Sequence, residues 1–500
     1  MSKPALDKDL KKLVQVEKAT QEISRTLATP GLLIIFMVGA VVVATRAMDQ
    51  SSYAHFVVIA AVIAAYMAVN IGANDVANNM GPAVGSRVLT MTGAIAIAAF
   101  FEAAGAILAG GDVVQTVAKG LLIEDHGIVD ISFIHVMMAA LLAAALWIHL
   151  ATFLGAPVST THAIVGGVMG SGAAAAGFAA VNWSVMGIIA ASWVISPIFG
   201  GLFAAILLGL IKSLIIYRKD KVAAARRWVP PLVGLMAGVF AMYLATKGLS
   251  RIWRPALEIV IVIGFIGFAL GFFVARPWVE RRAALIENRR KAIAELFALP
   301  LVGAVALLSF AHGANDVANA VGPLAAIVAV AQQTSSGVGQ VALPFWVLAI
   351  GALGISLGLT LFGPKLIRLV GEKITKMDPI RAYCVALSAA TTVLVASALG
   401  LPVSSTHIAV GAVFGVGYLR EYITNRGVPN PAVSPRSVFL EPSKLNATPE
   451  EAITNFRKRE KRMLIRRQHV FAIGAAWVIT VPAAGFLAAA CYMLMTAVSG

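Results

Sequence analysis

The sequence predicts an all-α polytopic membrane protein with two inverted-topology repeats, interrupted helices and about 12–13 transmembrane segments. Three observations support this fold class. First, 59% of the 500 residues are hydrophobic and only 13% are charged, whereas soluble domains carry about 25% charged residues. Second, many apolar windows of about 20 residues follow one another, each long enough to cross a hydrocarbon core of about 30 Å. Third, two polar motifs inside apolar runs each occur twice, in the same order.

The formal net charge of +16 does not indicate a nucleic-acid partner. The basic residues gather in a few short stretches between apolar segments, which is typical of the cytoplasmic loops of membrane proteins. The two cysteines, Cys384 and Cys491, lie in apolar segments far apart in the chain, so neither a disulfide nor a cysteine-bound metal is expected. The lipid bilayer, and no nucleic acid, is therefore the predicted surrounding of this chain.

The chain divides into four predicted parts. Residues 1–53 form a cytoplasmic tail and an extra transmembrane helix, 54–217 the first repeat, 218–292 a linker with two transmembrane helices, and 293–500 the second repeat with a cytoplasmic loop at 420–467. Apolar stretches are expected near 30–47, 54–74, 88–111, 131–155, 157–180, 183–217, 229–248, 256–275, 293–314, 324–363, 380–399, 402–419 and 469–498.

The basic residues of the loops predict that the two repeats are inverted. Loop 112–130 contains one lysine, whereas its counterpart 364–381 contains five Lys or Arg. The join at 181–182 has no charge, whereas its counterpart 420–467 has eleven Lys or Arg. Loops rich in Lys and Arg stay in the cytoplasm, so corresponding loops lie on opposite sides, with the N-terminus in the cytoplasm and the C-terminus outside. Inverted repeats are a common plan of secondary transporters, whose substrate site lies between the repeats near the midplane.

The first motif, Gly-Ala-Asn-Asp-Val-Ala-Asn, occupies 72–78 and returns at 313–319. Carboxylate and amide oxygens are ligands for hard cations, and if Asp75 begins a half-helix, Asn78 lies on the same face. The alternative is a buried polar cluster that joins helices by hydrogen bonds, but two copies on inverted halves converge on one central site and favour cation binding. The predicted cation-binding residues are Asn74, Asp75, Asn78, Asn315, Asp316 and Asn319, with Asp75 and Asp316 as metal ligands if the cation is sodium.

The second motif, Pro-Val-Ser followed by Ser or Thr, then Thr and His, begins at Pro157 and at Pro402. A proline followed by Ser or Thr indicates a helix start whose hydroxyls cap free amides. Capping alone is the alternative to an anion site, which free amides at the positive end of a helix also form. Two starts that face each other from inverted halves would surround a tetrahedral oxyanion. The predicted anion-binding residues are Ser159, Thr160, Thr161, Ser404, Ser405 and Thr406.

Three further ionisable residues lie in apolar segments. His162 and His407 follow the hydroxyl residues and could donate to an anion, carry a proton, or tie their helices to a neighbour, and the structural tie is favoured. Glu102 is a candidate for ion coupling, because ionisable residues within a membrane usually face the bundle interior. The region related to it by the repeat, near Gly354, has no acid, so any coupling role is one-sided.

These motifs closely resemble those of the PiT family of inorganic phosphate transporters. The two Gly-Ala-Asn-Asp-Val-Ala-Asn copies, each followed by Gly-Pro, and the two Pro-Val-Ser-(Ser/Thr)-Thr-His copies carry the resemblance, which covers roughly 54–217 and 293–498, and the segment 362–375 is also similar. The resemblance implies cation-coupled phosphate uptake, with sodium or a proton as coupling ion and no organic cofactor, by a homodimer.

Carried over by motif, the resemblance implies that the six hydroxyl residues hold phosphate, free or as a metal-phosphate complex, and that the cation lies with Asp75, Asn78, Asp316 and Asn319. One departure concerns the helix before the second Pro-Val-Ser motif, where many relatives carry an acid. The segment Ala382 to Ala390 has none, which leaves the identity and stoichiometry of the coupling ion open.

The resulting prediction is a secondary active symporter for inorganic phosphate in the inner or plasma membrane, with alternating access between the repeats. The cation would neutralise Asp75 and Asp316 and so allow a divalent anion to enter beside them. A permease of the same fold for sulfate or another oxyanion is the alternative within this class, and an ion channel is a further one. An enzyme is not expected, because the chain has neither a soluble catalytic domain nor a Ser-His-acid order.

Overall fold

The computed structural model describes residues 28–49, 51–123, 130–156, 158–248, 253–332, 343–373, 377–426 and 467–499. The predicted features outside these residues are the tail at 1–27, Pro157 and the loop segment 427–466. Within the described residues the chain is helical, and the one strand-like pairing is an isolated bridge between Leu122 and Val181. The prediction of an all-α protein is confirmed.

The helices of the N-terminal half and linker follow a first helix at Ala28–Ala47. They are α2 (Ala54–Gly85), α3 (Met91–Ala109), α4 (Gly111–Gln115), α5 (Asp130–Leu154), α6 (Thr160–Ala176), α7 (Trp183–Ile211), α8 (Lys221–Tyr243) and α9 (Leu257–Ala283). Those of the C-terminal half are α10 (Arg290–Ile293), α11 (Ala298–Asp316), α12 (Ala318–Ala331), α13 (Phe345–Lys373), α14 (Pro379–Ala398), α15 (Ser405–Arg426) and α17 (Arg467–Ser499).

Eleven helical stretches of the described residues are long and apolar enough to cross a membrane. The fold is therefore that of a multi-pass membrane protein. Two of the 13 predicted apolar stretches are not among these eleven: 157–180, where α6 has 17 residues and falls below the length of a full span, and 402–419, where α15 lies. The apolar run predicted near 324–363 is divided between α12 and α13.

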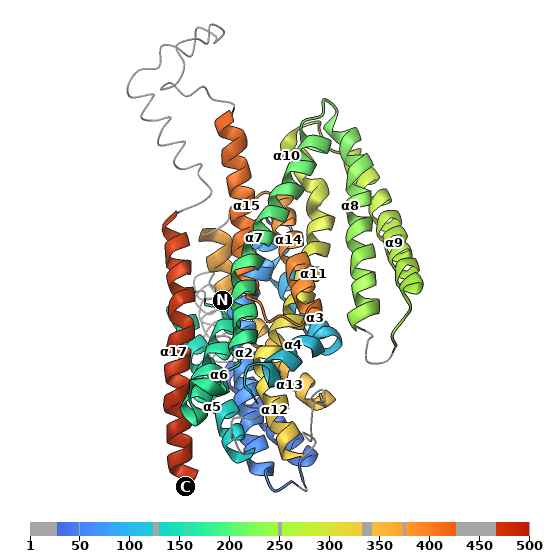
Figure 1. Cartoon of the computed structure of the whole chain (residues 1–500). Helices are drawn as coiled ribbons and strands as arrows, with labels where there is room; N and C mark the ends of the chain where they lie inside the picture. Colours follow the sequence, from blue (N-terminus) through green and yellow to red (C-terminus); the bar gives the residue numbers. More distant parts are fainter. Residues whose placement is uncertain are drawn as a thin grey trace, which may run out of the picture.

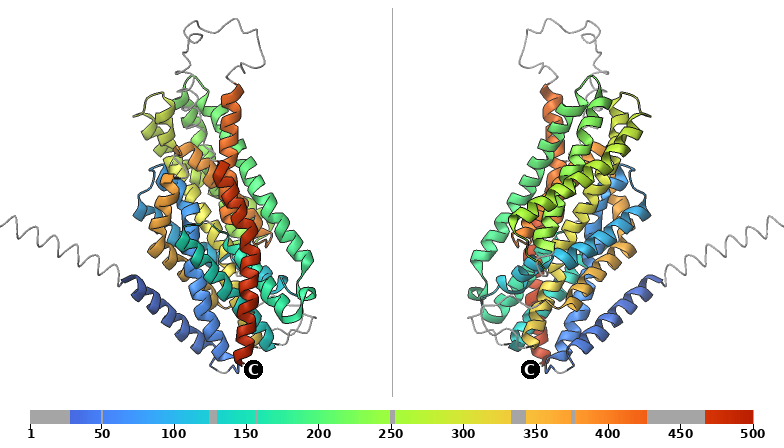
Figure 2. Two further views of the ribbon diagram at one scale, coloured as in Figure 1. Left: turned by 90° about the vertical axis from the view of Figure 1, so that its left-hand side faces the viewer. Right: turned by 90° about the vertical axis from the view of Figure 1, so that its right-hand side faces the viewer.

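Helices of the two halves interleave in matching pairs. The helix α2 packs along α13, and its counterpart α11 packs along α3; likewise α6 packs on α17, and α15 packs on α7. Figure 1 shows α2 rising from the end of the molecule where the C-terminus lies, whereas α11 enters from the opposite end, beside α10. Both features are consistent with inverted repeats. The linker helices α8 and α9 pack mainly on each other and stand at one side of the bundle (Figures 1 and 2).

Two glycines of the first motif explain how closely these pairs approach. A Cβ atom at Gly72 on α2 would collide with the carbonyl of Ile355 on α13, and a Cβ atom at Gly313 on α11 would collide with the carbonyl of Glu102 on α3. Glycine lets helix backbones touch inside a membrane. Because Gly72 and Gly313 are equivalent in the two motif copies, their contacts also identify Glu102 and Ile355 as equivalent positions.

The two Pro-Val-Ser motifs begin helices, as predicted. Each follows a glycine with a left-handed backbone, Gly155 (φ 70°) after α5 and Gly400 (φ 69°) after α14, a conformation that ends helices and favours glycine. Asp75 does not begin a half-helix, because α2 continues from Ala54 to Gly85 without a break. In the second copy α11 passes into α12 through the single residue Val317, whose backbone stays near-helical (φ −57°, ψ −30°).

Candidate functional site

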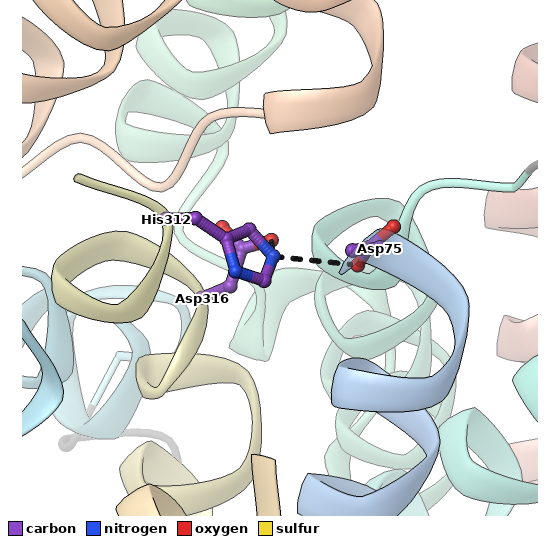
Figure 3. A group of neighbouring side chains, drawn as sticks. All are labelled: Asp75, His312 and Asp316. Atoms are coloured by element: carbon purple, nitrogen blue, oxygen red, sulfur yellow. Dashed lines mark ion pairs between the residues drawn. The ribbon is translucent and has the colours of Figure 1, made fainter. Parts of the chain in front are cut away.

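The two aspartates of the repeated motif meet at the centre of the bundle, with a histidine between them (Figure 3). Asp75 on α2 and Asp316 at the end of α11 are each 1% exposed. Nε2 of His312 lies 3.1 Å from Oδ2 of Asp316 and 3.8 Å from Oδ2 of Asp75. Nδ1 of the same ring lies 3.2 Å from Oε2 of Glu102, which is fully buried on α3. Three helices therefore bring three carboxyl groups onto one imidazole.

Hydroxyl groups from both helix starts donate to these carboxylates. Oγ1 of Thr160 lies 3.2 Å from Oδ2 of Asp75 and 3.4 Å from Oδ2 of Asp316. Oγ of Ser405 donates to Oδ2 of Asp316 at 3.0 Å, and Oγ1 of Thr406 donates to Oδ1 of Asp75 at 3.1 Å. The residues predicted to bind a cation and those predicted to bind an anion thus form one hydrogen-bonded cluster.

The last residue of each motif copy, Asn78 or Asn319, links the two halves. Nδ2 of Asn78 donates to Oγ1 of Thr406 at 2.8 Å, and Nδ2 of the equivalent Asn319 donates to Oγ1 of Thr161 at 3.2 Å. Each bond joins the first motif of one half to the second motif of the other. The symmetric pattern is consistent with a pseudo-twofold relation between the halves.

The remaining predicted residues have supporting contacts. The amides of Asn74 and Asn315 donate to equivalent hydroxyls, at 2.9 Å to Thr152 and 3.0 Å to Ser397. Ser159 and Ser404 act as N-caps, accepting the backbone amides three residues on at 3.2 Å and 3.3 Å. Asn74 and Asn315 therefore tie their helices to α5 and α14, and their role as cation ligands stays a prediction.

The cluster holds more acid than base. Three buried carboxyl groups, those of Asp75, Glu102 and Asp316, have His312 as their ion-pair partner in the described part of the chain. A buried charge without a partner is strongly unfavourable, so the excess of carboxyl groups makes this site suitable for a cation. Two acceptors are open for it within the described residues, because Oδ1 of Asp316 and Oδ1 of Asn319 are buried and accept no hydrogen bond.

The pairing of Glu102 with His312 breaks the symmetry of the site. The repeat places Ile71 opposite His312 and Ile355 opposite Glu102, so two isoleucines occupy the positions of the ion pair in the other half. Nδ2 of Asn79, whose counterpart is an alanine, donates to Oε1 of Glu102 at 2.9 Å. These contacts support the prediction that any role of Glu102 is one-sided.

His312 is the residue of this site that the sequence analysis did not single out. Its signal is visible in the sequence, since a lone histidine stands one residue before the second motif copy, where the first copy has Ile71. It also lies four residues before Asp316, so both side chains share one helix face. Asp75, His312 and Asp316 offer ligand atoms within 4.8 Å of one another, which is compatible with a shared metal ion.

The histidines of the second motif lie apart from this cluster of acids. The rings of His162 and His407 are 4.6 Å apart between centroids, and the ring of Trp193 on α7 stands edge-on at 3.8 Å from that of His162. The indole of Trp193 in turn donates to the carbonyl of Pro402 at 3.2 Å. These contacts support the predicted structural tie between helix starts and a neighbouring helix.

Comparison with known proteins identifies the family of this chain. The family model described as the phosphate transporter family matches residues 71–488. The chain belongs to the phosphate transporter family. A Helicobacter pylori protein named "Putative phosphate permease" is 44% identical over 97% of this chain and 98% of its own length, and one of Thermococcus kodakarensis is 38% identical over 73% and 89%.

A solved structure described as "The sodium-dependent phosphate transporter" has the same fold, with a TM-score of 0.76, 34% sequence identity, and coverage of 89% of this chain and 100% of that chain. The chain is therefore an integral multi-pass member of the phosphate transporter family, and its family and fold are those of a transporter rather than an enzyme.

Proposed function

We propose that this phosphate transporter family member is a secondary active symporter that moves inorganic phosphate with a cation by alternating access. One observation supports the proposed coupling of cation and phosphate: the hydroxyls of Thr160, Ser405 and Thr406 donate to Asp75 and Asp316. Each hydroxyl has one proton to donate, so a carboxylate and a phosphate oxygen compete for the same donors. Phosphate can bind here only when the carboxylates release them.

A cation supplies that release. Oxygen ligands suit a hard cation such as sodium, and Oδ1 of Asp316 and Oδ1 of Asn319 are the open acceptors that support a site there. A cation held by Asp75 and Asp316 neutralises the carboxylates and takes over their lone pairs. The three hydroxyls can then turn toward an anion without leaving a buried carboxylate unpaired. Binding of cation and phosphate is thereby mutually dependent.

The helix starts supply the remaining donors for phosphate. The helices α6 and α15 begin at Thr160 and Ser405, where the first amides of a helix and its dipole favour an anion. His162 and His407, close to the two starts, touch across the pseudo-twofold relation, so the two helix starts lie near each other. An oxyanion between them would receive hydroxyl and amide donors from both halves. Ser159 and Thr161 would shape the first turn of α6, and Ser404 that of α15.

Sodium is the coupling ion that we propose first. The structural neighbour is described as sodium-dependent, and the donor set of this chain fits sodium. A proton is the second candidate, and it rests on the contact of His312 with Glu102 at 3.2 Å and with Asp316 at 3.1 Å. An imidazole between two carboxyl groups can take up and pass a proton, so both ions have a chemically suitable place in this cluster.

Further parts of the proposal concern assembly and orientation. We propose a homodimer in the cell membrane, on the family resemblance, with the N-terminus in the cytoplasm and the C-terminus outside, on the distribution of basic loops. The division into two repeats with the linker 218–292 is supported by the interleaved helix pairs. During alternating access, the two equivalent hydrogen bonds between the halves, Asn78 to Thr406 and Asn319 to Thr161, would break and form in turn.

Uptake of radiolabelled phosphate into proteoliposomes tests the proposed function. A sodium gradient and a pH gradient are imposed separately, and sulfate is offered as competitor. The sodium symporter predicts uptake that follows the sodium gradient, whereas uptake that follows only the pH gradient assigns the proton. Stronger uptake of sulfate than of phosphate would establish the oxyanion alternative. Ion flux without co-transported phosphate would overturn the symporter in favour of a channel.

A further inference from the structure

A long apolar groove runs along the outer face of the bundle between α7 and α15, beside Val478 of α17. Its volume is about 1010 Å³, at the upper end of the range of about 300–1,000 Å³ for small-molecule sites. On α7 the groove is bordered by Val194, Ile198 and Leu202, which are 62%, 66% and 58% exposed. Such a face of a membrane protein lies toward lipid, and the acid and hydroxyl cluster lies elsewhere in the bundle.

The groove is longer than the hydrocarbon layer of one membrane leaflet is thick. Along α15 it extends from His407 to Tyr422, which is about 22 Å of helix at about 1.5 Å per residue. One leaflet contributes about 15 Å of hydrocarbon, half of a core of about 30 Å. Tyr418 and Tyr422 lie at the outer end, where tyrosine rings commonly mark the membrane interface. This end adjoins the basic loop after α7, on the predicted cytoplasmic side.

A buried lysine lies just beyond the outer end of the groove. Gly209 on α7 packs near the side chain of Leu419, a groove residue of α15 close to Tyr422. Lys212 follows Gly209 by three positions, on the same side of the helix, and is 8% exposed. In the described part of the chain its amine has neither a hydrogen bond nor an ion pair within 4.0 Å.

The charges around Lys212 are mostly positive. Among the residues that the structure describes, Arg290, Arg381 and Arg420 act on its amine, and Asp378 is the acid that does so. That acid is already engaged, since Oδ2 of Asp378 lies 2.9 Å from a guanidinium nitrogen of Arg381. A mostly buried lysine side chain beside three guanidinium groups and, in the described residues, one paired carboxylate favours an anion. The basic cluster adjoins the outer end of the apolar groove through the contact of Gly209 with Leu419, so a ligand that covers both has an anionic head and a long apolar chain.

We propose that an anionic phospholipid of the predicted cytoplasmic leaflet binds here, with an acyl chain in the groove between α7 and α15 and its phosphate on Lys212 and Arg420. Basic pockets between transmembrane helices on that side are suited to lipid headgroups. The acyl chain would end against Trp193 and His162. His162 directly follows Thr161, whose hydroxyl belongs to the polar cluster. The lipid therefore contacts the outer side of a helix start whose inner side carries the polar site.

Lipid binding can be measured without any transport assay. The full-length protein is reconstituted in nanodiscs of phosphatidylcholine containing photoactivatable phosphatidylglycerol or, in parallel, photoactivatable phosphatidylcholine. Crosslinked peptides are mapped by mass spectrometry, and retained lipids are counted by native mass spectrometry. We expect crosslinks of the phosphatidylglycerol probe on α7 and α15, in excess over those of the phosphatidylcholine probe. Equal labelling by the two probes would overturn the proposal.

Two pairs of variants separate the head and chain parts of the site. Lys212→Gln should lower the preference for phosphatidylglycerol about fivefold, the factor for one basic residue near a lipid surface, whereas the exposed Arg218→Gln should leave it unchanged. Ala205→Trp fills the groove and should remove the crosslinks, whereas Ile206→Trp, 50% exposed and outside the groove, should retain them.

Two results would contradict the proposal even if a variant folded poorly. Soluble glycerol phosphate that displaced the lipid probe from the wild-type protein would reduce the site to a headgroup site without a chain. A second outcome is a change in the monomer–dimer ratio of Ala205→Trp, measured by mass photometry, with lipid crosslinks intact. That outcome would assign the groove to a second copy of the chain.

Discussion

Replacement of Asp316 by asparagine tests the cation half of the proposed site. The carboxylate of Asp316 accepts from Ser405 at 3.0 Å, lies 3.1 Å from Nε2 of His312, and has one open buried oxygen, Oδ1. An asparagine side chain at this position would keep the volume and one acceptor oxygen but lose the negative charge. The variant therefore isolates the charge from the shape of the site.

The expected loss follows from the electrostatics of the cluster. A cation about 2.4 Å from a carboxylate oxygen gains about 7 kcal/mol at an effective dielectric constant near 20. Desolvation and the remaining amide oxygen offset part of this, so the net loss should be about 3–5 kcal/mol, typical for one partner of a buried ion pair. The sodium dissociation constant should rise by about a hundredfold to a few thousandfold.

Isothermal titration of sodium in the presence of phosphate measures this change, and sodium-driven uptake should be lost with it. Asp75→Asn should behave in the same way, because Asp75 occupies the equivalent position of the first half. The midpoint of thermal unfolding should not fall, since Asp316→Asn removes one of three clustered acids. A sodium dissociation constant within about threefold of the wild-type value would refute the assignment, and unfolding of the variant would show that its charge is needed for the fold instead.

The remaining predictions concern other contacts of the cluster and its packing. Thr406→Val, which keeps the shape and removes the donor to Asp75, should weaken phosphate binding by about tenfold to a hundredfold, the range for a hydrogen bond to a charged group; unchanged phosphate affinity by titration would remove Thr406 from the site. Glu102→Gln should lower the uptake rate because His312 loses a charged partner 3.2 Å away. The sodium concentration at half-maximal uptake should change by less than about threefold. A larger change in this concentration would make Glu102 a sodium ligand. Gly313→Ala should destabilise the fold, because its Cβ would collide with the carbonyl of Glu102, whereas Gly187→Ala, with no atom within 4 Å, should be neutral or stabilising by about 0.5–1 kcal/mol. Equal unfolding temperatures of these two glycine variants would contradict the close packing of α3 on α11.

Local signals in the sequence predicted the helix starts of the site. The starts after Ser159 and Ser404 could be predicted because capping depends on residues within one turn, and the structure shows both caps. The acids could be placed near each other because the motif is repeated. The predicted inverted arrangement also indicated that the acids lie near hydroxyl groups of both halves, but it did not predict which hydroxyl donates to which carboxylate.

Tertiary packing decided what the sequence analysis missed. The sequence was compatible with a half-helix beginning at Asp75, but the nearby Gly72 serves the close approach of α2 to α13, and the helix continues. The partner of Glu102 could not be found from spacing, because α3 and α11 meet only in the folded chain. His312 is visible in the sequence, but its contacts with Asp75 and Glu102 could not be found for the same reason, since these acids lie on two other helices.

Mutual dependence of cation and phosphate binding is the central claim, and a linkage titration tests it most directly. The phosphate dissociation constant of the purified protein is measured at fixed pH and ionic strength, in sodium and in choline. We predict that sodium tightens phosphate binding, that phosphate tightens sodium binding by the same factor, and that Asp316→Asn abolishes both effects. Phosphate binding that is equally tight in sodium and in choline would contradict sodium coupling through the shared hydroxyl donors.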